Sequence, residues 1–446
     1  MTHLARHRRL WGALALCAVG ALARAQAPPS GEPEPAVPVP PEATLPGPPV
    51  PTGPVPEPSG WRRWLNPSTA PFIPVPEIAT DPNGGTTVGL LPVWLRTNEQ
   101  HQIDRIFAPD VLHNSYFGWG MHARLYMYPS EDVQWSAVVG VKQRVEHELD
   151  LEYQWGRLRN NRWSFAGSLI SDRDGSPRYY GIGNDTPQSA ETNYTAQQQV
   201  ARGLIGFNLS HTWQFAYLVR LRWMDVLPGT LPKIDSIEER FGDSVLGNDR
   251  EFLHRLALIH DTRDNLTVSS SGAQYITYVG AASREFFFND AMYREAGFDG
   301  RLFWRLSPDT ILATHLSLHY LFNDHSPPFW TLSTLGGQAS DVGGQQPLRG
   351  FGAGRYTDRD AFSTTVELRH RVFGFNALST RVDIEMSPFL DLGRVFANSD
   401  TFPVSGLHTV GGIGFRAIAR PFVVGYVDIG YGSEGTAIFT GINYPF

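Results

Sequence analysis

Hydrophobic and polar residues alternate one by one along most of the chain after Thr86. In the run 116–128, for example, Trp119 and Met121 fall on one parity, whereas His122 falls on the other. A period of two predicts β-strands with one apolar and one polar face. Each such run has ~10–13 residues, which is the length that a tilted strand needs to cross a bilayer. The pattern therefore predicts membrane-spanning strands.

About 16 runs of this kind follow one another, and an even number is typical of single-chain bacterial barrels. They start near Thr86, Ser115, Val133, His147, Arg162, Gln197, Trp213, Glu251, Ala273, Tyr293, Thr310, Ala361, Thr380, His408, Phe422 and Ala437. A soluble β-sandwich or propeller is the alternative, but its strands are about half as long and recur every 8–12 residues or so. The expected fold is all-β: a transmembrane antiparallel β-barrel of about 16 strands.

The connections between these runs alternate in length. Every second connection is short, apart from a longer one after Asp261; the short ones are 129–132, 157–161, 210–211, 307–309, 373–378 and 420–421. The others comprise hairpins near Glu146 and Ser433 and the long segments 173–196, 228–250 and 323–360. Short periplasmic turns and long extracellular loops are the arrangement of outer-membrane barrels. We therefore expect 323–360, which contains Arg349, to be the longest extracellular loop.

The N-terminal part of the chain differs from the rest in composition. Arginines precede an apolar run from Leu10 to Ala23, which predicts a secretory signal peptide over 1–25. Residues 26–60 are rich in proline and are expected to form a disordered linker. Residues 61–85 are assigned to an N-terminal lead-in segment and 86–446 to the outer-membrane β-barrel.

Removal of the signal peptide changes the charge and the thiol content. The signal peptide holds four of the 37 basic residues and none of the 44 acidic ones, so the mature chain carries 33 basic residues and a formal charge of −11. This balance excludes a basic nucleic-acid-binding surface. Cys17 is the single cysteine, so we expect neither disulfides nor cysteine catalysis in the mature chain. Export combined with spanning strands predicts localisation in the bacterial outer membrane.

The last strand closes on an aromatic residue. Counting back by twos from Phe446 gives Tyr444, Ile442 and Thr440, which we expect to form a lipid-facing row. A final strand with a terminal phenylalanine resembles the signal by which outer-membrane barrels are recognised for assembly. Phe446 and Tyr444 are therefore the expected assembly signal, and the barrel assembly machinery and outer-membrane lipid are the expected partners.

Several motifs occur in one order along the chain and point to a known family. They are YYGIGNDT at 179–186, DTRDN from Asp261, LRGF at 348–351, FLDLGRVF at 389–396, GGIGFR at 411–416 and the closing GINYPF. Over residues 72–446 they resemble the bacterial surface-antigen barrel of the BamA/TamA and two-partner-secretion transporter superfamily. Typical members carry periplasmic POTRA domains before the barrel. Here the proline linker and residues 61–85 stand in that place, so the chain resembles the branch of the superfamily that lacks POTRA domains.

The resemblance implies a role for the loop that contains Arg349. In this family the loop folds inward into the barrel and its arginine meets acidic residues of the inner wall. Glu367 and Asp391 match those acids by motif, and the planar guanidinium suits a bidentate contact with a carboxylate. Gly350 would let the backbone turn tightly, and Phe351 would pack beneath the loop. The alternative is a solvated arginine on a mobile external loop.

Catalytic and metal sites are poorly supported by the sequence. His315, Ser317 and His319 share one face of a strand, which leaves an outer-membrane hydrolase as an alternative. A spacing of two is simply the strand period, however, and the motif GxSxG does not occur. The histidines are dispersed, without the spacing of a metal site. We therefore expect no enzyme, no catalytic residues, no metal and no cofactor.

The expected work of the chain is outer-membrane biogenesis or translocation of protein or lipid. It would use a lateral seam between the first and last strands, or a gated lumen plugged by the Arg349 loop, and an unknown periplasmic partner is possible in place of POTRA domains. A passive or gated channel, or a purely structural barrel, is the alternative from another class, and the hydrolase is the second alternative.

Overall fold

The computed structural model describes residues 73–446, apart from 99–102, 284–289, 323–326, 338–347, 378–379, 398–404, 420–422, 443 and 445. All of these residues belong to one compact unit, Pro58–Phe446. The predicted signal peptide, the proline-rich linker and residues 61–72 of the lead-in segment lie outside the described residues. None of the helices in the described ranges is long and apolar enough to cross a membrane.

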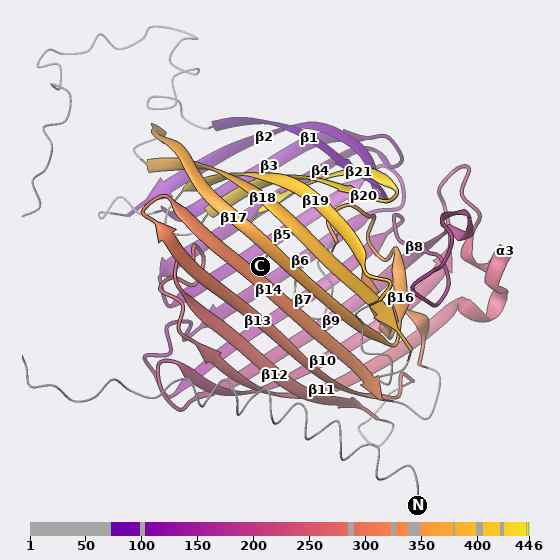
Figure 1. The fold of residues 1–446 in the computed structure, drawn as a ribbon. Helices are drawn as coiled ribbons and strands as arrows, with labels where there is room; N and C mark the ends of the chain where they lie inside the picture. Colours follow the sequence, from indigo (N-terminus) through magenta and orange to yellow (C-terminus); the bar gives the residue numbers. More distant parts are fainter. Residues whose placement is uncertain are drawn as a thin grey trace, which may run out of the picture. The chain divides into compact units, whose positions relative to one another are not determined.

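The unit is built from a 19-stranded antiparallel sheet that winds around an interior (Figure 1). All of its strands except the two-residue β8 follow one meander, in which each strand pairs with the next. The strands are β1 Ile73–Asp81, β2 Gly85–Thr97, β3 Ile103–Asn114, β4 Gly118–Ser130, β5 Val133–Lys142, β6 His147–Trp155, β7 Trp163–Asp174, β8 Arg178–Tyr179, β9 Thr192–Asn208, β10 Trp213–Pro228, β11 Gly247–Asp261, β12 Gly272–Ala282, β13 Tyr293–Ser307, β14 Thr310–Phe322, β17 Asp360–Ala377, β18 Thr380–Phe396, β19 His408–Ala419, β20 Val423–Gly432 and β21 Gly435–Ile442.

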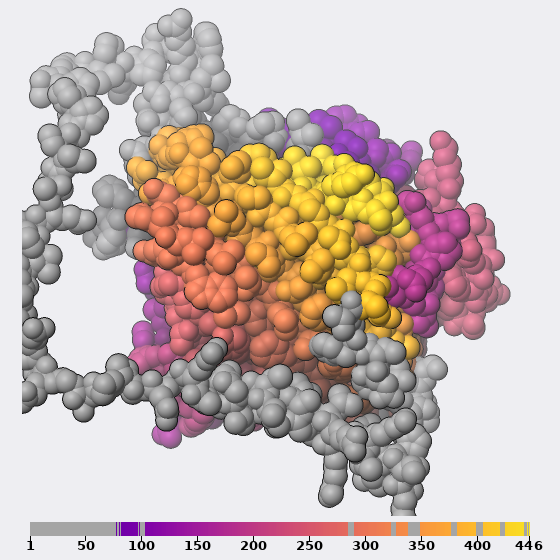
Figure 2. Space-filling model, in the orientation of Figure 1, coloured from indigo at the N-terminus to yellow at the C-terminus, as the bar shows by residue number. Residues whose placement is uncertain are grey.

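The alternating pattern of the sequence separates the two faces of this sheet. On β17, Val366 points outward with 44% of its surface exposed, whereas Glu367 points inward and has no exposed surface. Leu390 and Asp391 on β18 divide in the same way. The strands from β13 to β21, coloured orange to yellow, form a continuous outer wall in Figure 2. The outer face is therefore apolar and the lumen is polar, as in barrels that cross a lipid bilayer.

Two strands of the meander were not predicted from the sequence, whose pattern indicated about 16 strands. These strands are β1, which lies inside the expected lead-in segment 61–85, and β3. They carry Pro74, Pro76 and Pro109, and proline argues against a strand assignment because it lacks an N–H group. The sheet consequently begins before residue 86. Because two strands were added, the later connections stay at the ends of the barrel that the sequence pattern assigned to them.

The two ends of the barrel differ in their connections. The longest connections gather at one end (Figure 1), which we name the loop end. We name the opposite end the turn end. At the loop end, the connection from β10 to β11 contains α3 (Ile237–Phe241) and η2 (Asp243–Val245), and η1 (Gln188–Ala190) precedes β9. The connection from β14 to β17 contains η3 (Phe329–Thr331), β15 (Ser333–Leu335) and β16 (Tyr356–Asp358), and β15 pairs with β16.

The first and last strands lie beside each other and form a seam (Figure 1). In the described residues, no backbone ladder joins β1 to β21. Pro74 lies opposite Pro92 in the pairing of β1 with β2. Two prolines cannot form a hydrogen-bonded pair, so the backbone N atom of Pro74 faces away from β2 and toward β21. Pro76 lies two residues further along the strand, and its backbone N atom therefore points in the same direction. Pro92 faces β3 for the same reason, and the β2–β3 ladder is interrupted there, between Leu90 and Trp94.

Candidate functional site

The loop between β14 and β17 turns sharply at the residues that carry Arg349 into the lumen. Leu348 has a φ of 62°, and the backbone N–H groups of Gly350 and Phe351 both donate to its carbonyl oxygen. Gly350 lies so close to the wall that a Cβ there would come within 2.8 Å of Val410 and 2.9 Å of the backbone N of Gly432. Gly350 is therefore required for close approach to the wall rather than for a left-handed turn.

Arg349 has no exposed surface and meets three carboxylates. Its Nε donates to Asp391 Oδ2 at 3.0 Å and its Nη2 to Asp391 Oδ1 at 2.9 Å, which is a bidentate contact. Its Nη1 donates to Asp428 Oδ2 at 3.1 Å and lies 3.5 Å from Glu367 Oε2. Burial by itself lowers the pKa of Arg349, but the carboxylates of Asp391, Glu367 and Asp428 outweigh it and raise that pKa above its ordinary value.

A second buried arginine completes the group. Arg416 on β19 donates to Glu367 Oε1 at 2.7 Å and to Asp428 Oδ1 at 2.6 Å. The guanidinium of Arg349 also lies over the ring of Phe389, 3.5 Å from its centroid, a cation–π contact. We call Arg349, Glu367, Asp391, Arg416 and Asp428 the Arg349 cluster. It joins the loop to β17, β18, β19 and β20.

An apolar layer packs against this cluster. Phe351 is buried, and its ring lies 5.3 Å from that of Tyr356 and 5.9 Å from that of His408, both edge-on. This apolar layer also includes Leu335, Leu348, Ala361, Phe389, Val395 and Val410. Charged and apolar contacts together therefore hold the loop against the last strands of the barrel.

The loop also contacts both sides of the seam at the loop end. Asn83, in the turn between β1 and β2, donates from Nδ2 to the carbonyl oxygen of Ala353 at 2.7 Å. On the other side, Arg355 contacts Glu434, in the turn between β20 and β21, with Nε at 2.7 Å and Nη2 at 2.6 Å from Oε1. Residues 349–355 thus span the seam between the first and last strands.

The last residues of the chain do not face lipid as the sequence pattern predicted. Strand β21 ends at Ile442, and Phe446 is buried against Phe303 of β13 and Ala313 of β14. Tyr444 packs against Val268, Ile418 and Val424. Because the strand ends before these residues, the period of two no longer sets their direction. Their lipid-facing placement is wrong, and their role as an assembly signal stays a prediction.

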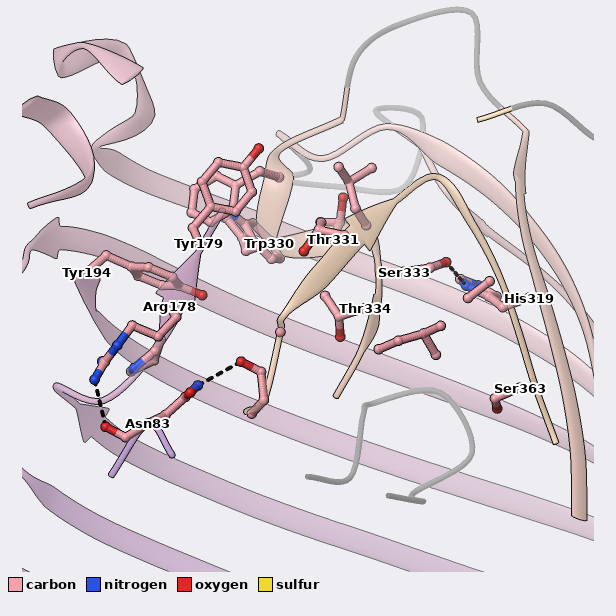
Figure 3. Close-up of a pocket in the computed structure, with 18 of the residues that line it drawn as sticks. Asn83, Arg178, Tyr179, Tyr194, His319, Trp330, Thr331, Ser333, Thr334 and Ser363 are labelled. Atoms are coloured by element: carbon pink, nitrogen blue, oxygen red, sulfur yellow. Dashed lines mark hydrogen bonds between the residues drawn. The ribbon is translucent and has the colours of Figure 1, made fainter. Parts of the chain in front are cut away.

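The histidines that raised the hydrolase alternative have partners other than Ser317. In the described residues, His315 Nε2 contacts Asp299 Oδ2 at 2.7 Å. His319 shares a hydrogen bond of 2.7 Å between its Nδ1 and Ser333 Oγ (Figure 3), and its Nε2 lies 3.4 Å from Glu295 Oε2. Ser333 belongs to β15, so His319 holds the inward loop to the wall. Among the described residues, no cluster of His, Cys, Asp or Glu is arranged to hold a metal ion.

Asp428 and Arg416 were missed as members of the cluster. A signal for Asp428 was available, because it is the single charged residue of the run 423–432 and shares the parity of the inward glycines of β20. Arg416 was quoted within a motif without a partner. Their contacts depend on strands that meet in space, which a single strand pattern does not reveal.

Comparisons with known proteins agree with this architecture. A family model described as the Omp85 superfamily domain matches residues 134–417, whereas no curated protein matches the chain. A BamA structure from Haemophilus ducreyi lacking POTRA domains 1–3 is similar, with a TM-score of 0.47, 13% identity and coverage of 83% of this chain and 74% of that one. CdiB from Escherichia coli has a TM-score of 0.44 and 10% identity, with coverage of 84% and 62%. CdiB from Acinetobacter baumannii has a TM-score of 0.44 and 13% identity, with coverage of 83% and 59%, so the chain spans about three fifths of the two CdiB structures. Because the family model spans well over half of the sequence, this chain belongs to the Omp85 superfamily of outer-membrane β-barrels.

Proposed function

We propose that this barrel acts in outer-membrane biogenesis or translocation of protein or lipid, and that cargo reaches the membrane through the seam between β1 and β21. The observation that carries the proposal is the loop that bridges the seam, with Asn83 on one side and Glu434 on the other. A loop anchored on both sides of a strand junction couples any movement of the loop to the width of that junction.

The edge of β1 supports this proposal because it is poor in hydrogen-bond donors. Pro74 and Pro76 point their N atoms toward β21 and have no N–H group. Prolines on an edge strand prevent it from pairing fully with another strand. Such a seam opens at lower cost than the ladders elsewhere in the sheet, which is what lateral release of cargo requires.

The Arg349 cluster supports the same role for the loop. It braces the loop on β17 to β20, the strands that lead to the seam. The cargo is either polypeptide or lipid, and the proposal includes no chemical reaction. It includes the barrel assembly machinery and an unidentified periplasmic component as partners.

The test is lipid and polypeptide transfer by the purified protein in liposomes, with the seam locked or free. Cysteines in place of Thr80 on β1, and of Thr436 or Ile438 on β21, are joined by a short thiol crosslinker. The matched control joins Met121→Cys to Val141→Cys, which lie opposite each other in the β4–β5 ladder.

We expect movement of labelled lipid between leaflets, or insertion of an unfolded barrel protein, that stops when the seam is crosslinked and continues in the control. Equal transfer in both crosslinked proteins would reject the seam. No transfer in any form, together with conductance steps after deletion of residues 348–358, would replace the proposal with a plugged channel. No activity of either kind would leave a structural barrel.

A further inference from the structure

We propose that the lumen holds a binding site for the chain's own tail segment, Tyr444 and Phe446, and that the occupied site closes the lumen at a place separate from the Arg349 loop. The proposal concerns the interior of the barrel and does not depend on the seam or on any cargo.

The part of the site that encloses Phe446 is built from β13 and β14. The ring of Phe446 stacks on His315 of β14 with 5.3 Å between centroids and 17° between planes. It packs against Phe303 of β13 and Ala313 of β14, and it is 7% exposed. An aromatic ring enclosed on these sides is removed from water like the side chain of a core residue, which favours the inward position.

Arg369 of β17 holds both aromatic rings of the tail segment. Its guanidinium carbon lies 4.0 Å from the ring centroid of Tyr444 and 4.9 Å from that of Phe446. Its Nη2 donates to the backbone oxygen of Phe446 at 3.4 Å. The Tyr444 hydroxyl lies 3.3 Å and 3.4 Å from the two carboxylate oxygens of Glu385. Arginine suits this position because its flat face stacks on rings while its edge donates hydrogen bonds.

The tail segment lies between two hollow parts of the lumen. A loop-end chamber of about 300 Å³ includes His315, Ser317 and His319 in its lining. Figure 3 shows His319 among the residues that line it. A turn-end chamber of about 580 Å³ includes Tyr444 and Phe446. His315 borders the first chamber and Phe446 borders the second, so the stacked pair separates them.

The same wall residue connects the tail segment to the loop. Glu367 Oε2 lies 3.5 Å from Arg349 Nη1 and 3.9 Å from Arg369 Nη2. The two arginines thus share one carboxylate oxygen, one holding the loop and the other the tail segment. If one of these arginines is displaced, the negative charge of Glu367 is balanced by fewer cations, so it attracts the remaining arginine more strongly. We therefore predict that closure by the loop and closure by the tail segment are coupled.

The first experiment locates the tail segment in native membranes. Ser136→Cys on β5 lines the turn-end chamber together with Tyr444 and Phe446. Labelled with a short thiol-reactive photocrosslinker, it is expected to form a crosslink to the unchanged peptide that contains Tyr444 and Phe446. Val139→Cys, which is exposed on the outer face of β5, is the control and should not form that crosslink. No tail crosslink from Ser136→Cys, or an equal yield from the two positions, would overturn the proposal.

The second experiment measures conductance in planar bilayers for the full chain and for Tyr444→Ala/Phe446→Ala. Coupling free energies of the usual size change an equilibrium roughly 5- to 150-fold, so we expect open probability to rise at least about 5-fold in the tail variant. Phe446→Tyr keeps a stacking ring and is expected to stay closed. Trp135→Ala removes an aromatic residue from β5, which lines the same turn-end chamber, and serves as the control.

Combining the tail variant with Arg349→Ala tests the coupling. We expect the combined effect on open probability to differ from the product of the two separate effects. An unchanged conductance in the tail variant, or an equal rise in Trp135→Ala, would reject closure by the tail segment, and a purely multiplicative result would reject the coupling through Glu367. None of these measurements uses cargo, so failure of lipid or polypeptide transfer would count against the proposed function alone.

Discussion

A guanidinium without exposed surface is stable in this lumen because three carboxylates face it. Arg349 and Arg416 supply two positive charges against Glu367, Asp391 and Asp428, and Arg369 approaches Glu367 as a third cation. The group is therefore close to neutral, and each buried charge has a partner of opposite sign.

Replacing Arg349 by alanine is expected to destabilise the folded barrel by about 3–5 kcal/mol, because it leaves buried carboxylates without their cation. Arg349→Lys keeps the charge but loses the bidentate geometry, so an intermediate effect is expected. The measurement is thermal unfolding in detergent, followed by the shift in gel mobility on heating. Arg381→Ala, which removes an exposed arginine paired with Asp383, is the control. An unfolding temperature of Arg349→Ala equal to that of the control would contradict the prediction.

At this scale, motif and parity identified part of the candidate site. Glu367 and Asp391 were expected from the motif and the inward parity, and the structure brings both to Arg349. Asp428 was missed because its contact with Arg349 joins β20 to a loop 79 residues earlier in the chain, which the parity of a strand does not reveal. The direction of Phe446 was wrong because the period of two holds only while a segment stays in the ladder.

At the scale of elements, most strands were predictable because a bilayer imposes both a length and a period of two on them. Strands β1 and β3 escaped this reasoning because their prolines interrupt the donor pattern that defines a typical strand. In β1 the prolines have a physical consequence, since they leave gaps along the edge that faces β21.

Restoring donors to that edge is expected to tighten the seam. In Pro74→Thr/Pro76→Thr, each new backbone hydrogen bond would add about 0.5–1.5 kcal/mol. We expect a higher unfolding temperature and slower lipid transfer in liposomes.

Pro92→Thr is the matched control, because its new N–H group faces β3 inside the sheet. It should raise the unfolding temperature without slowing transfer. Equal slowing in both variants would show that the effect does not arise at the seam.

At the scale of the whole molecule, the proposed function requires an outer face of the sheet that meets lipid and an inner face that meets water and the loop. The composition and the predicted signal peptide pointed to export, the alternating pattern pointed to a barrel, and the motifs pointed to an inward loop. No sequence pattern revealed that Tyr444 and Phe446 also enter the lumen. Those contacts depend on the curvature of the sheet, which winds around one interior (Figure 1) and brings β13, β17 and β20 to it.

A charge on the outer face tests this arrangement. Val366→Arg is expected to destabilise the inserted barrel by about 2–4 kcal/mol if the residue lies near the bilayer midplane. Gln188→Arg, in an exposed loop, should have no such effect. Folding into lipid vesicles, titrated with urea, measures the difference. Equal stability of the two variants in vesicles would argue against contact between this face and lipid.

The inward course of the tail segment has a practical consequence for handling the protein. A purification handle fused after Phe446 would compete with the tail segment for the space beside His315 and Arg369 and would disturb the closure of the lumen that we propose. A handle inserted at Pro232 or Lys233, which are exposed in the connection between β10 and β11, would leave the interior intact. Preparations that differ in this choice should therefore be compared before their electrical behaviour is attributed to the native chain.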